Sequence, residues 1–318
     1  HGMFPDVPLV SFTATDFRTS KKRKFSEIYD ERIQISTYRQ EMADRFLVPT
    51  KVIAPKGIAS MDGVKLKRTF GELDYDEDEM AERFSQERLY ASLLSEWTNC
   101  TGRKYPTIIF NINQRHNREV CEFFKNHGVR AEYIDDKTPD DVRDSVLRKF
   151  KQGPFVEDPI MVLCNIGIFT EGVSAEYTKC VVLNYKTKSL QKYVQSSARG
   201  SRPVWNSDYS DWLKVDGKYY KERITIIDCG ANWAEHGMLE DYDQFGAEMD
   251  EERKRGEAPV KSCPECNLVI YASVMTCPQC GHIFPPKPKE DKRKFGDEVE
   301  WGEVDSAKSI RLMVSRMS

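Results

Sequence analysis

The sequence lacks several features that mark whole classes of protein. Across 318 residues, no apolar run approaches the roughly 18 residues that a membrane-spanning helix needs, and the first ten residues lack the layout of a signal peptide. The net charge of −3 gives no overall attraction to nucleic acid, so any such contact needs a local basic face. There is no internal repeat. The composition, 39% hydrophobic and 31% charged, is typical of a soluble globular protein with a highly charged surface.

The middle of the chain alternates buried-strand patterns with helix patterns. The strand patterns are at residues 107–112, 131–135, 160–165, 179–184 and 224–230. Between the second and third, residues 137–153 carry helix signals, with Thr138 at the N-cap and Pro139 in the first turn. Strands rich in Val and Ile and separated by helices predict a parallel sheet covered on both faces. The α/β core is expected to span about residues 85 to 247.

The nine cysteines fall into two groups. Five are scattered, mostly in apolar stretches, as is typical of small core residues: Cys100, Cys121, Cys164, Cys180 and Cys229. The other four have C-x2-C-x10-C-x2-C spacing: Cys263, Cys266, Cys277 and Cys280. Each C-x2-C pair can direct two thiolates at one ion, so this set predicts a closed, tetrahedral, structural Zn²⁺ site. Redox-active pairs are the alternative, but prolines follow Cys263 and Cys277, and no thioredoxin-like unit surrounds them.

Four segments occur in an order that resembles a known protein family. They are SFTAT (11–15), TIIFNINQRHN (107–117), VLCNIGIFTEGVS (162–174) and QKYVQSSARGSRP (191–203). The series resembles motifs III, IV, V and VI of superfamily 2 helicases and translocases. Residues 42–55 and 226–237 narrow the resemblance to the bacterial and phage DEAD/DEAH-like group that includes the RadD-type repair helicases. A zinc ribbon after the second lobe also resembles RadD-type proteins.

The resemblance implies a fold and a division of the chain. The fold is α/β: a RecA-like parallel sheet with helices on both faces, which is the second helicase lobe, plus a small zinc ribbon. The expected parts are the tail of the first RecA-like lobe with the inter-lobe linker (1–50), an extended or loop insert (51–84), the second lobe (85–247), a charged linker (248–262), the zinc ribbon (263–284) and a polar tail with a short helix (285–318).

Two arginines in the last motif are the main catalytic candidates. Arg199 and Arg202 are three residues apart, so on a helix they would share a face and could reach one phosphate group. By resemblance, Arg202 is the arginine finger that stabilises charge on the γ-phosphate of ATP, Arg199 is its companion, and Gln195 is a polar contact near the nucleotide. The alternative is a solvated basic helix face. Ala198 departs from the glycine that is common in the family at its position.

Further candidates concern nucleic acid and its coupling to ATP. By resemblance, the coupling residues are Thr170, Glu171, Gly172, Thr13 and Thr15, the last two acting between the lobes. A plain strand-to-helix turn is the alternative for residues 170–172, and Ser174 stands where the family has an acidic residue, which puts one contact in doubt. At the start of the helix after residues 107–112, the candidates for backbone contact are Asn113, Arg115 and His116. Helix N-termini favour phosphate, although a simple polar cap explains these three residues nearly as well.

The sequence has no G-x-x-x-x-G-K-[ST] motif, and no D-E-x-x box precedes residues 11–15. The acidic run YDEDEM (75–80) follows that motif in a loop-like stretch, which is the wrong context for such a box. The phosphate cradle and the Mg²⁺-holding carboxylate are therefore expected on an N-terminal RecA-like lobe, in cis or in trans. Three interpretations stay open: a fragment of a longer helicase, one half of a split enzyme, or a nucleic-acid-binding remnant without catalysis.

The resemblance thus implies the C-terminal part of an ATP-dependent DNA helicase or translocase, inactive by itself. The alternatives are a non-catalytic nucleic-acid-binding or partner-binding module with a zinc ribbon, and a restriction or remodelling motor that shares the lobes. The expected cofactors are ATP and Mg²⁺ at a shared site, and structural Zn²⁺. The expected partners are single-stranded or branched DNA, with RNA as the alternative, and a replication or repair protein. No membrane is involved, and a cytoplasmic location in a bacterium or a phage-infected cell is expected.

Overall fold

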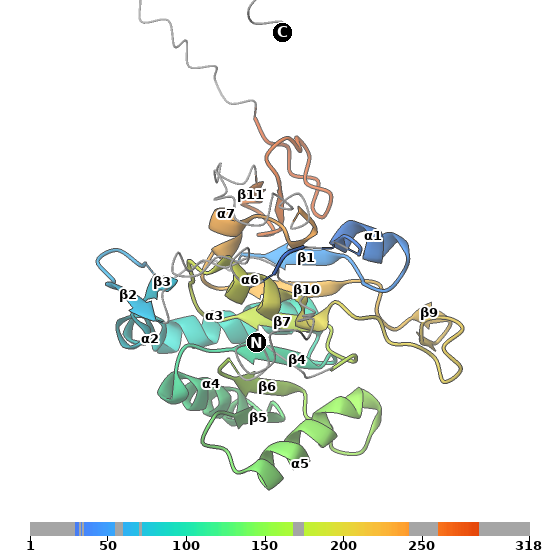
Figure 1. Ribbon diagram of the computed structural model, residues 1–318, viewed down its shortest axis with the longest axis horizontal. Coiled ribbons are helices and arrows are strands. Elements are labelled where there is room, and N and C mark those ends of the chain that lie inside the picture. The colour runs from blue at the N-terminus through green and yellow to red at the C-terminus, as the bar shows by residue number, and fades with distance from the viewer. Residues whose placement is uncertain are drawn as a thin grey trace, which may run out of the picture. The chain divides into compact units, whose positions relative to one another are not determined.

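The computed structural model describes residues 29–31, 33, 35–54, 60–69, 72–167, 175–241 and 260–285. Its main feature is a six-stranded sheet in the order β1-β10-β7-β4-β6-β5, in which all neighbouring strands are parallel (Figure 1). The strands are β1 (Thr50–Ile53), β4 (Thr107–Phe110), β5 (Ala131–Ile134), β6 (Val162–Asn165), β7 (Cys180–Leu183) and β10 (Ile224–Asp228). The predicted parallel sheet is confirmed.

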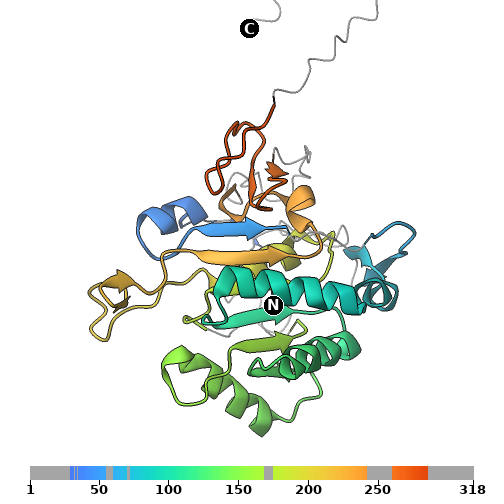
Figure 2. The ribbon, with the colours of Figure 1, turned by 180° about the vertical axis from the view of Figure 1, so that it is seen from behind.

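Helices cover both faces of this sheet, as parallel strands require. One face carries α3 (Glu87–Thr101) and α4 (Gln114–Asn126), which lie in front in Figure 2. The opposite face carries α5 (Asp140–Lys151) and α6 (Leu190–Ser197), which lie in front in Figure 1. Trp97 anchors α3, because it is fully buried and its indole N–H donates to Thr107 Oγ1 at 2.8 Å.

The core contains most of the scattered cysteines, as expected. Strands β4, β6 and β7 are buried along their whole length. Cys164 and Cys180 lie within them, and burial raises the pKa of both thiols well above the ordinary value. Cys121 and Cys229 are also buried, whereas Cys100 is only half-buried. The thiols of Cys164 and Cys180 are therefore protonated and act as small packing groups.

The extended or loop insert expected over residues 51–84 contains strands and a helix. Strand β1 belongs to the edge of the main sheet, and β2 (Leu66–Thr69) pairs with β3 (Glu72–Tyr75) as an antiparallel hairpin. The acidic run after β3 begins α2 (Glu77–Phe84), and Asp76 caps it by accepting the N–H groups of Asp78 and Glu79. Acidic residues are favourable in the first turn of a helix, which explains why a sequence that reads as a loop is helical here.

The shorter elements complete the described chain. Helix α1 (Tyr38–Ala43) has a hydroxyl cap, because Thr37 Oγ1 accepts the N–H of Gln40. Helix α5 begins one residue later than expected: its N-cap is Pro139, and Thr138 Oγ1 bonds Asp135 instead. The remaining elements are η2 (Gly153–Phe155), η4 (Ala198–Gly200), β8 (Lys214–Val215), β9 (Lys218–Tyr219), α7 (Asn232–His236), β11 (Val260–Ser262) and β12 (Val269–Tyr271). Within the described ranges, no helix has both the length and the apolar character needed to cross a lipid bilayer.

Candidate functional site

The two arginines expected to contact ATP lie on a tight turn after α6. The α-helix ends at Ser197, and the single 3-10 turn η4 follows it. Arg199 belongs to η4, and Arg202 comes after it. The shared face of one α-helix, which the spacing predicted for both arginines, is therefore replaced by this tighter turn. Residues 198–202 are called the arginine turn below.

Close packing against the sheet holds the arginine turn in place. Gly200 is buried, and a Cβ at this position would lie 3.3 Å from Val181 Cγ2 and 3.4 Å from Ile224 Cδ1. A side chain here would require Val181, Ile224 or the turn to shift by a few tenths of an ångström. All three predicted nucleotide contacts are described: Gln195 and Arg199 are half-buried, and Arg202 is exposed. The turn thus presents Arg202 to solvent from a fixed backbone.

The arginine turn and the predicted nucleic-acid residues lie at opposite edges of the sheet. Val181 and Ile224 belong to the amino-terminal halves of β7 and β10, and the N–H of Val48, just before β1, donates to Ser201 O at 2.8 Å. Asn113, in contrast, follows the carboxyl end of β4. Because the six strands are parallel, all their amino ends share one edge. The two sets of predicted residues therefore cannot form one small cluster.

The residues expected to couple ATP to nucleic acid lie outside the described ranges: Thr13, Thr15, Thr170, Glu171 and Gly172, together with Ser174. The strand that precedes three of them, β6, is described and ends at Asn165. This side chain is fully buried, and its Nδ2 donates to Ile109 O at 3.2 Å. The coupling role of residues 170–172 stays a prediction.

The start of α4 is a polar cap. The Asn113 side-chain oxygen accepts the backbone N–H of His116 at 3.0 Å, and its Nδ2 donates to Asp78 Oδ1 at 3.1 Å. Arg115 is exposed, and its Nε lies 3.8 Å from Glu119 Oε1. The alternative reading of Asn113 as a cap is therefore the one that the structure shows. Arg115 is the member of the predicted trio whose side chain solvent reaches most freely.

His116 is a core residue, and its predicted contact with nucleic acid is wrong for this structure. Its side chain is fully buried and packs near the rings of Phe84 and Tyr90. Its Nδ1 accepts the N–H of Ile112 at 3.4 Å, and its Nε2 lies 3.4 Å from Asn184 Nδ2. Burial lowers the pKa of His116 to about 4, so the ring is neutral at pH 7. The His116 ring therefore packs and forms its polar contacts inside the core, at the start of α4.

A buried asparagine network at the carboxyl edge was not anticipated. Asn184 Nδ2 donates to Asn111 Oδ1, and Asn111 Nδ2 donates to Asn117 Oδ1, both at 2.9 Å. Asn117 Nδ2 in turn donates to Ile134 O at 3.2 Å. The signal was present in the sequence, because the adjacent strands β7 and β4 are each followed directly by asparagine, and β6 ends in one. Satisfied buried amides fix how these strand ends lie relative to one another.

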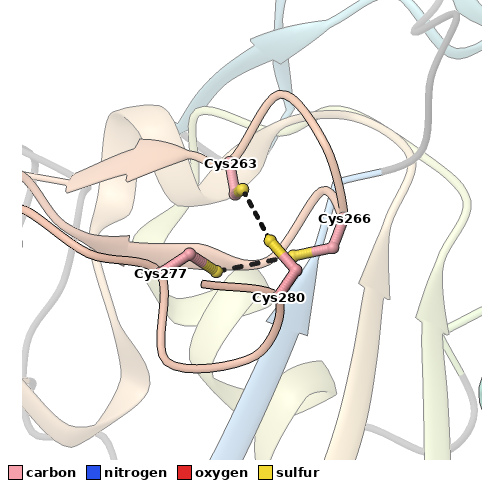
Figure 3. Close-up of side chains that lie close together, drawn as sticks. All are labelled: Cys263, Cys266, Cys277 and Cys280. Atoms are coloured by element: carbon pink, nitrogen blue, oxygen red, sulfur yellow. Dashed lines mark hydrogen bonds between the residues drawn. The ribbon is translucent and has the colours of Figure 1, made fainter. Parts of the chain in front are cut away.

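The four clustered cysteines converge from two loops. All four sulfur atoms lie within 4.8 Å of one another, with 3.6 Å between Cys263 and Cys280 and 3.5 Å between Cys266 and Cys277 (Figure 3). Strands β11 and β12 pair antiparallel beside them. Sequence spacing alone thus identified a set of side chains that the fold brings together.

The two cysteine loops have the same backbone design. In the first, the N–H of Asn267 donates to Cys263 O, and in the second, the N–H of Gly281 donates to Cys277 O, both at 2.9 Å. The residue after the second cysteine has positive φ in each loop, +59° at Asn267 and +75° at Gly281. Asparagine and glycine are the residues that adopt this conformation most readily. The repeated turn aims two sulfur atoms inward from each loop.

Comparison with protein families gives this geometry its context. Residues 87–203 match the family model described as the helicase conserved C-terminal domain. The match ends at Pro203, so the segment that is similar to a helicase C-terminal domain includes the arginine turn. The cysteine ribbon lies outside the match.

Individual relatives agree with this assignment. The 51.5 kDa protein of Lactococcus phage (isolate 7-9) is 26% identical over 312 residues, which are 96% of this chain and 62% of that protein. IRC3 of Saccharomyces cerevisiae, assigned as an ATP-dependent helicase, is 25% identical over 205 residues, which are 64% of this chain and 28% of that protein. This chain thus spans 62% of the length of the phage protein and 28% of the length of IRC3.

A solved structure supports the fold. A fragment assigned to the HsdR subunit of a type I restriction enzyme from Vibrio vulnificus YJ016 aligns with a TM-score of 0.52 and 21% identity. The alignment covers 73% of this chain and 42% of that one. At this identity the likeness concerns the arrangement of the helicase lobe, and the chemistry has to be argued from the residues.

Proposed function

We propose that this chain supplies the second RecA-like lobe of an ATP-driven helicase or translocase, and that the arginine turn reaches the γ-phosphate of ATP. The observation that carries the proposal is the exposed Arg202 on a backbone packed tightly against the sheet, at the end of the helicase-domain match. A guanidinium held this way needs little reorganisation to stabilise charge that develops on a transferring phosphoryl group. Arg199, half-buried on η4, acts as its companion.

The rest of the ATP site belongs to another lobe. No Walker A motif occurs in the 318 residues, so the phosphate cradle and the carboxylate that holds Mg²⁺ come from a first RecA-like lobe, in cis or in trans. When bound, Mg²⁺ neutralises phosphate charge. This chain contributes the arginines. The assignment of IRC3 as an ATP-dependent helicase supports the same class of reaction.

Nucleic acid is proposed to bind at the carboxyl edge of the sheet. Parallel sheets bind their ligands at that edge, where β6 ends and α4 begins. The exposed Arg115 offers a charged contact to a phosphate group there, while residues 170–172 would supply further contacts. DNA is the proposed substrate, in single-stranded or branched form, with replication or repair as the setting.

The cysteine cluster is proposed to hold a structural Zn²⁺. Four sulfur atoms within 4.8 Å of one another match the thiolate set that tetrahedral zinc prefers. Burial opposes ionisation of Cys277, but the backbone N–H groups of Cys280 and Gln279 lower the pKa of this thiol to about 6. Burial raises the pKa of Cys266, in the same cluster, to about 12, so ionisation of the whole set would depend on the metal, which binds the thiolate form. All four positions are protein ligands, and the ion would therefore act in folding.

The decisive experiment measures DNA-stimulated ATP hydrolysis by the chain combined with the lobe that carries the Walker A motif. Arg202→Ala is expected to lower kcat by about 10³-fold or more, which is the usual effect of losing an arginine finger. Arg148→Ala is the matched control, because Arg148 is equally exposed but lies on α5. Equal hydrolysis by the Arg202→Ala and Arg148→Ala proteins would refute the proposal. DNA binding without hydrolysis in any combination would favour the non-catalytic module.

A further inference from the structure

The cysteine ribbon is joined directly to the edge of the main sheet. The N–H of Ala54, just after β1, donates to Asn267 O at 3.0 Å. Ile53 and Leu268 form an isolated antiparallel bridge, so the ribbon, whose strands make a separate sheet, is joined to the edge strand at this point. Val260, at the start of β11, packs against the core of the helicase lobe. The ribbon therefore has a fixed position on this lobe and is well placed to support neighbouring elements.

A short turn at residues 239–241 joins the ribbon to α1 and β1. The hydroxyl of Tyr271, on β12, donates to Asp241 Oδ1 at 3.0 Å, and the same carboxylate pairs with Arg39 on α1. Arg39 Nε also donates to Glu240 O at 3.0 Å. Glu240 Oε1 accepts both the N–H and the hydroxyl of Thr50, at 2.7 and 2.6 Å. One turn thus contacts the ribbon, the first helix and the edge strand.

Helix α1 in turn contacts the arginine turn. The hydroxyl of Tyr38, next to Arg39, donates to Ser201 Oγ at 2.7 Å. Ser201 also accepts the N–H of Val48 through its carbonyl at 2.8 Å. Ser201 is fully buried and directly precedes Arg202. Both of its oxygen atoms are therefore held by residues of the segment 38–48, which enters the lobe immediately before β1.

We propose that the cysteine ribbon braces the arginine turn, with Asp241 and Tyr38 as positioning residues for Arg202. The contacts run from Tyr271 to Asp241, from Asp241 to Arg39, and from the neighbouring Tyr38 to Ser201. This gives the ribbon an internal role that needs no nucleic acid or partner protein. The inference rests on the proposed function of Arg202, because only a reaction in which that arginine acts would respond to the brace.

The strength of each contact sets the size of the expected effect. Arg39 is more than half exposed, so its ion pair with Asp241 contributes little to global stability. The two bonds to Ser201 are better shielded and fix a backbone next to a catalytic side chain. Because small displacements of catalytic groups are costly, we expect Asp241→Ala and Tyr38→Phe each to lower kcat about two- to tenfold. The KM for DNA should stay within about twofold of the parent value.

Hydrogen exchange gives a readout that does not depend on activity. The amide of Val48 reports the bond to Ser201 O. We expect it to exchange faster in Asp241→Ala, in Tyr38→Phe and after metal removal, while amides of β4 keep their protection. Glu119→Ala is the matched control, since Glu119 also accepts a tyrosine hydroxyl, from Tyr90 at 2.9 Å, and faces an arginine, but lies on α4. Exchange at Val48 should be unchanged in this control.

The outcomes separate the brace from the proposed function. If Arg202→Ala leaves hydrolysis intact, the proposed function itself fails. If Arg202→Ala abolishes hydrolysis while Asp241→Ala, Tyr38→Phe and metal removal leave kcat and Val48 exchange at parent values, the brace is refuted. Asp241→Ala keeps all four cysteines, so it tests the brace even where loss of metal unfolds the ribbon. Tyr38→Phe combined with Arg202→Ala should add no further loss to Arg202→Ala alone.

Discussion

Single residues in this lobe show how burial decides between chemically reasonable roles. His116 lies beside Arg115 at the start of a helix, yet the helix turns one side chain to solvent and the other into the core. A residue that begins a helix can equally be a phosphate ligand or a packed interior group, and only the direction of its Cα–Cβ bond separates the two. The asparagines after β4 and β7 follow the same rule, because they are buried and bond one another.

The neutral state of His116 predicts a pH dependence of stability. Its pKa is about 4 in the folded chain against about 6.5 when unfolded, so the unfolded chain binds the extra proton between these values. The contribution of the neutral ring is therefore complete above pH 6.5 and is lost as the pH falls toward 4, by about 3 kcal/mol. Denaturant titrations at pH 7 and pH 4.5 should show a smaller loss for His116→Gln than for the parent chain. The exposed-site substitution His127→Gln should leave the parent loss unchanged.

Among the elements, the segment that follows the β8–β9 hairpin is hydrogen-bonded to the loop before β7. Directly after β9, Tyr220 and Lys221 bond three successive carbonyl groups: Tyr220 donates to Tyr177 O at 3.1 Å, and Lys221 Nζ donates to the carbonyls of Glu176 and Thr178. Lys221 is 2% exposed. Burial lowers its pKa to about 7, although the charge of Glu176 opposes this shift. A neutral amine still has two N–H groups, enough for both carbonyls.

Lys221 predicts a second pH dependence, in the alkaline range. Its pKa is about 7 when folded and about 10.4 when unfolded, so the folded chain has already released the proton that the unfolded chain keeps. Stability should therefore rise from pH 7 to pH 10, by an amount on the order of a few kcal/mol. Equilibrium unfolding of Lys221→Met should show a clearly smaller rise. An identical rise in both proteins would mean that Lys221 stays charged in the fold.

At the scale of the whole molecule, the cysteine ribbon and the helicase lobe belong to one compact unit, which runs through Ile283. The ribbon bonds the edge strand through Ala54 and Asn267, and the turn at residues 239–241 through Tyr271. Elements that share backbone bonds tend to unfold together. The ribbon should therefore behave as part of the lobe and not as a separate module.

Metal removal tests whether the ribbon and the lobe unfold together. A chelator is expected to lower the midpoint of the main thermal transition by several degrees, because metal bound only to the folded state stabilises it by mass action. Calorimetry with and without added Zn²⁺ would measure the shift. Cys277→Ser should abolish the response, whereas Cys121→Ser, in the core, should retain it. If the midpoint of the main transition did not change with the metal and a separate small transition appeared, the ribbon and the lobe would not unfold as one unit.

Strong local signals made much of this protein predictable. Buried apolar runs and helix signals identified the parallel sheet, and the spacing of four cysteines identified a cluster that the fold brings together. The order of four short motifs identified the helicase domain. The insert at 51–84 was missed, because short strands and an acid-rich helix resemble loops when their neighbours are unknown. Each success depended on patterns that can be recognised in the sequence without knowing which segments pack together in the fold.

The sequence by itself determined which chemical groups this protein has: two arginines on either side of a glycine, four cysteines in two C-x2-C pairs, and several apolar segments. Tertiary structure alone decided where they lie. Because the strands are parallel, the arginine turn and the start of α4 lie at opposite ends of the strands. Packing against the core buried His116 and left Arg115 exposed. The fold also brought Tyr38 to Ser201 across 163 residues and Arg39 to Asp241 across 202 residues. Such pairings depend on chain topology, because a hydrogen bond between distant residues leaves no pattern in either local segment.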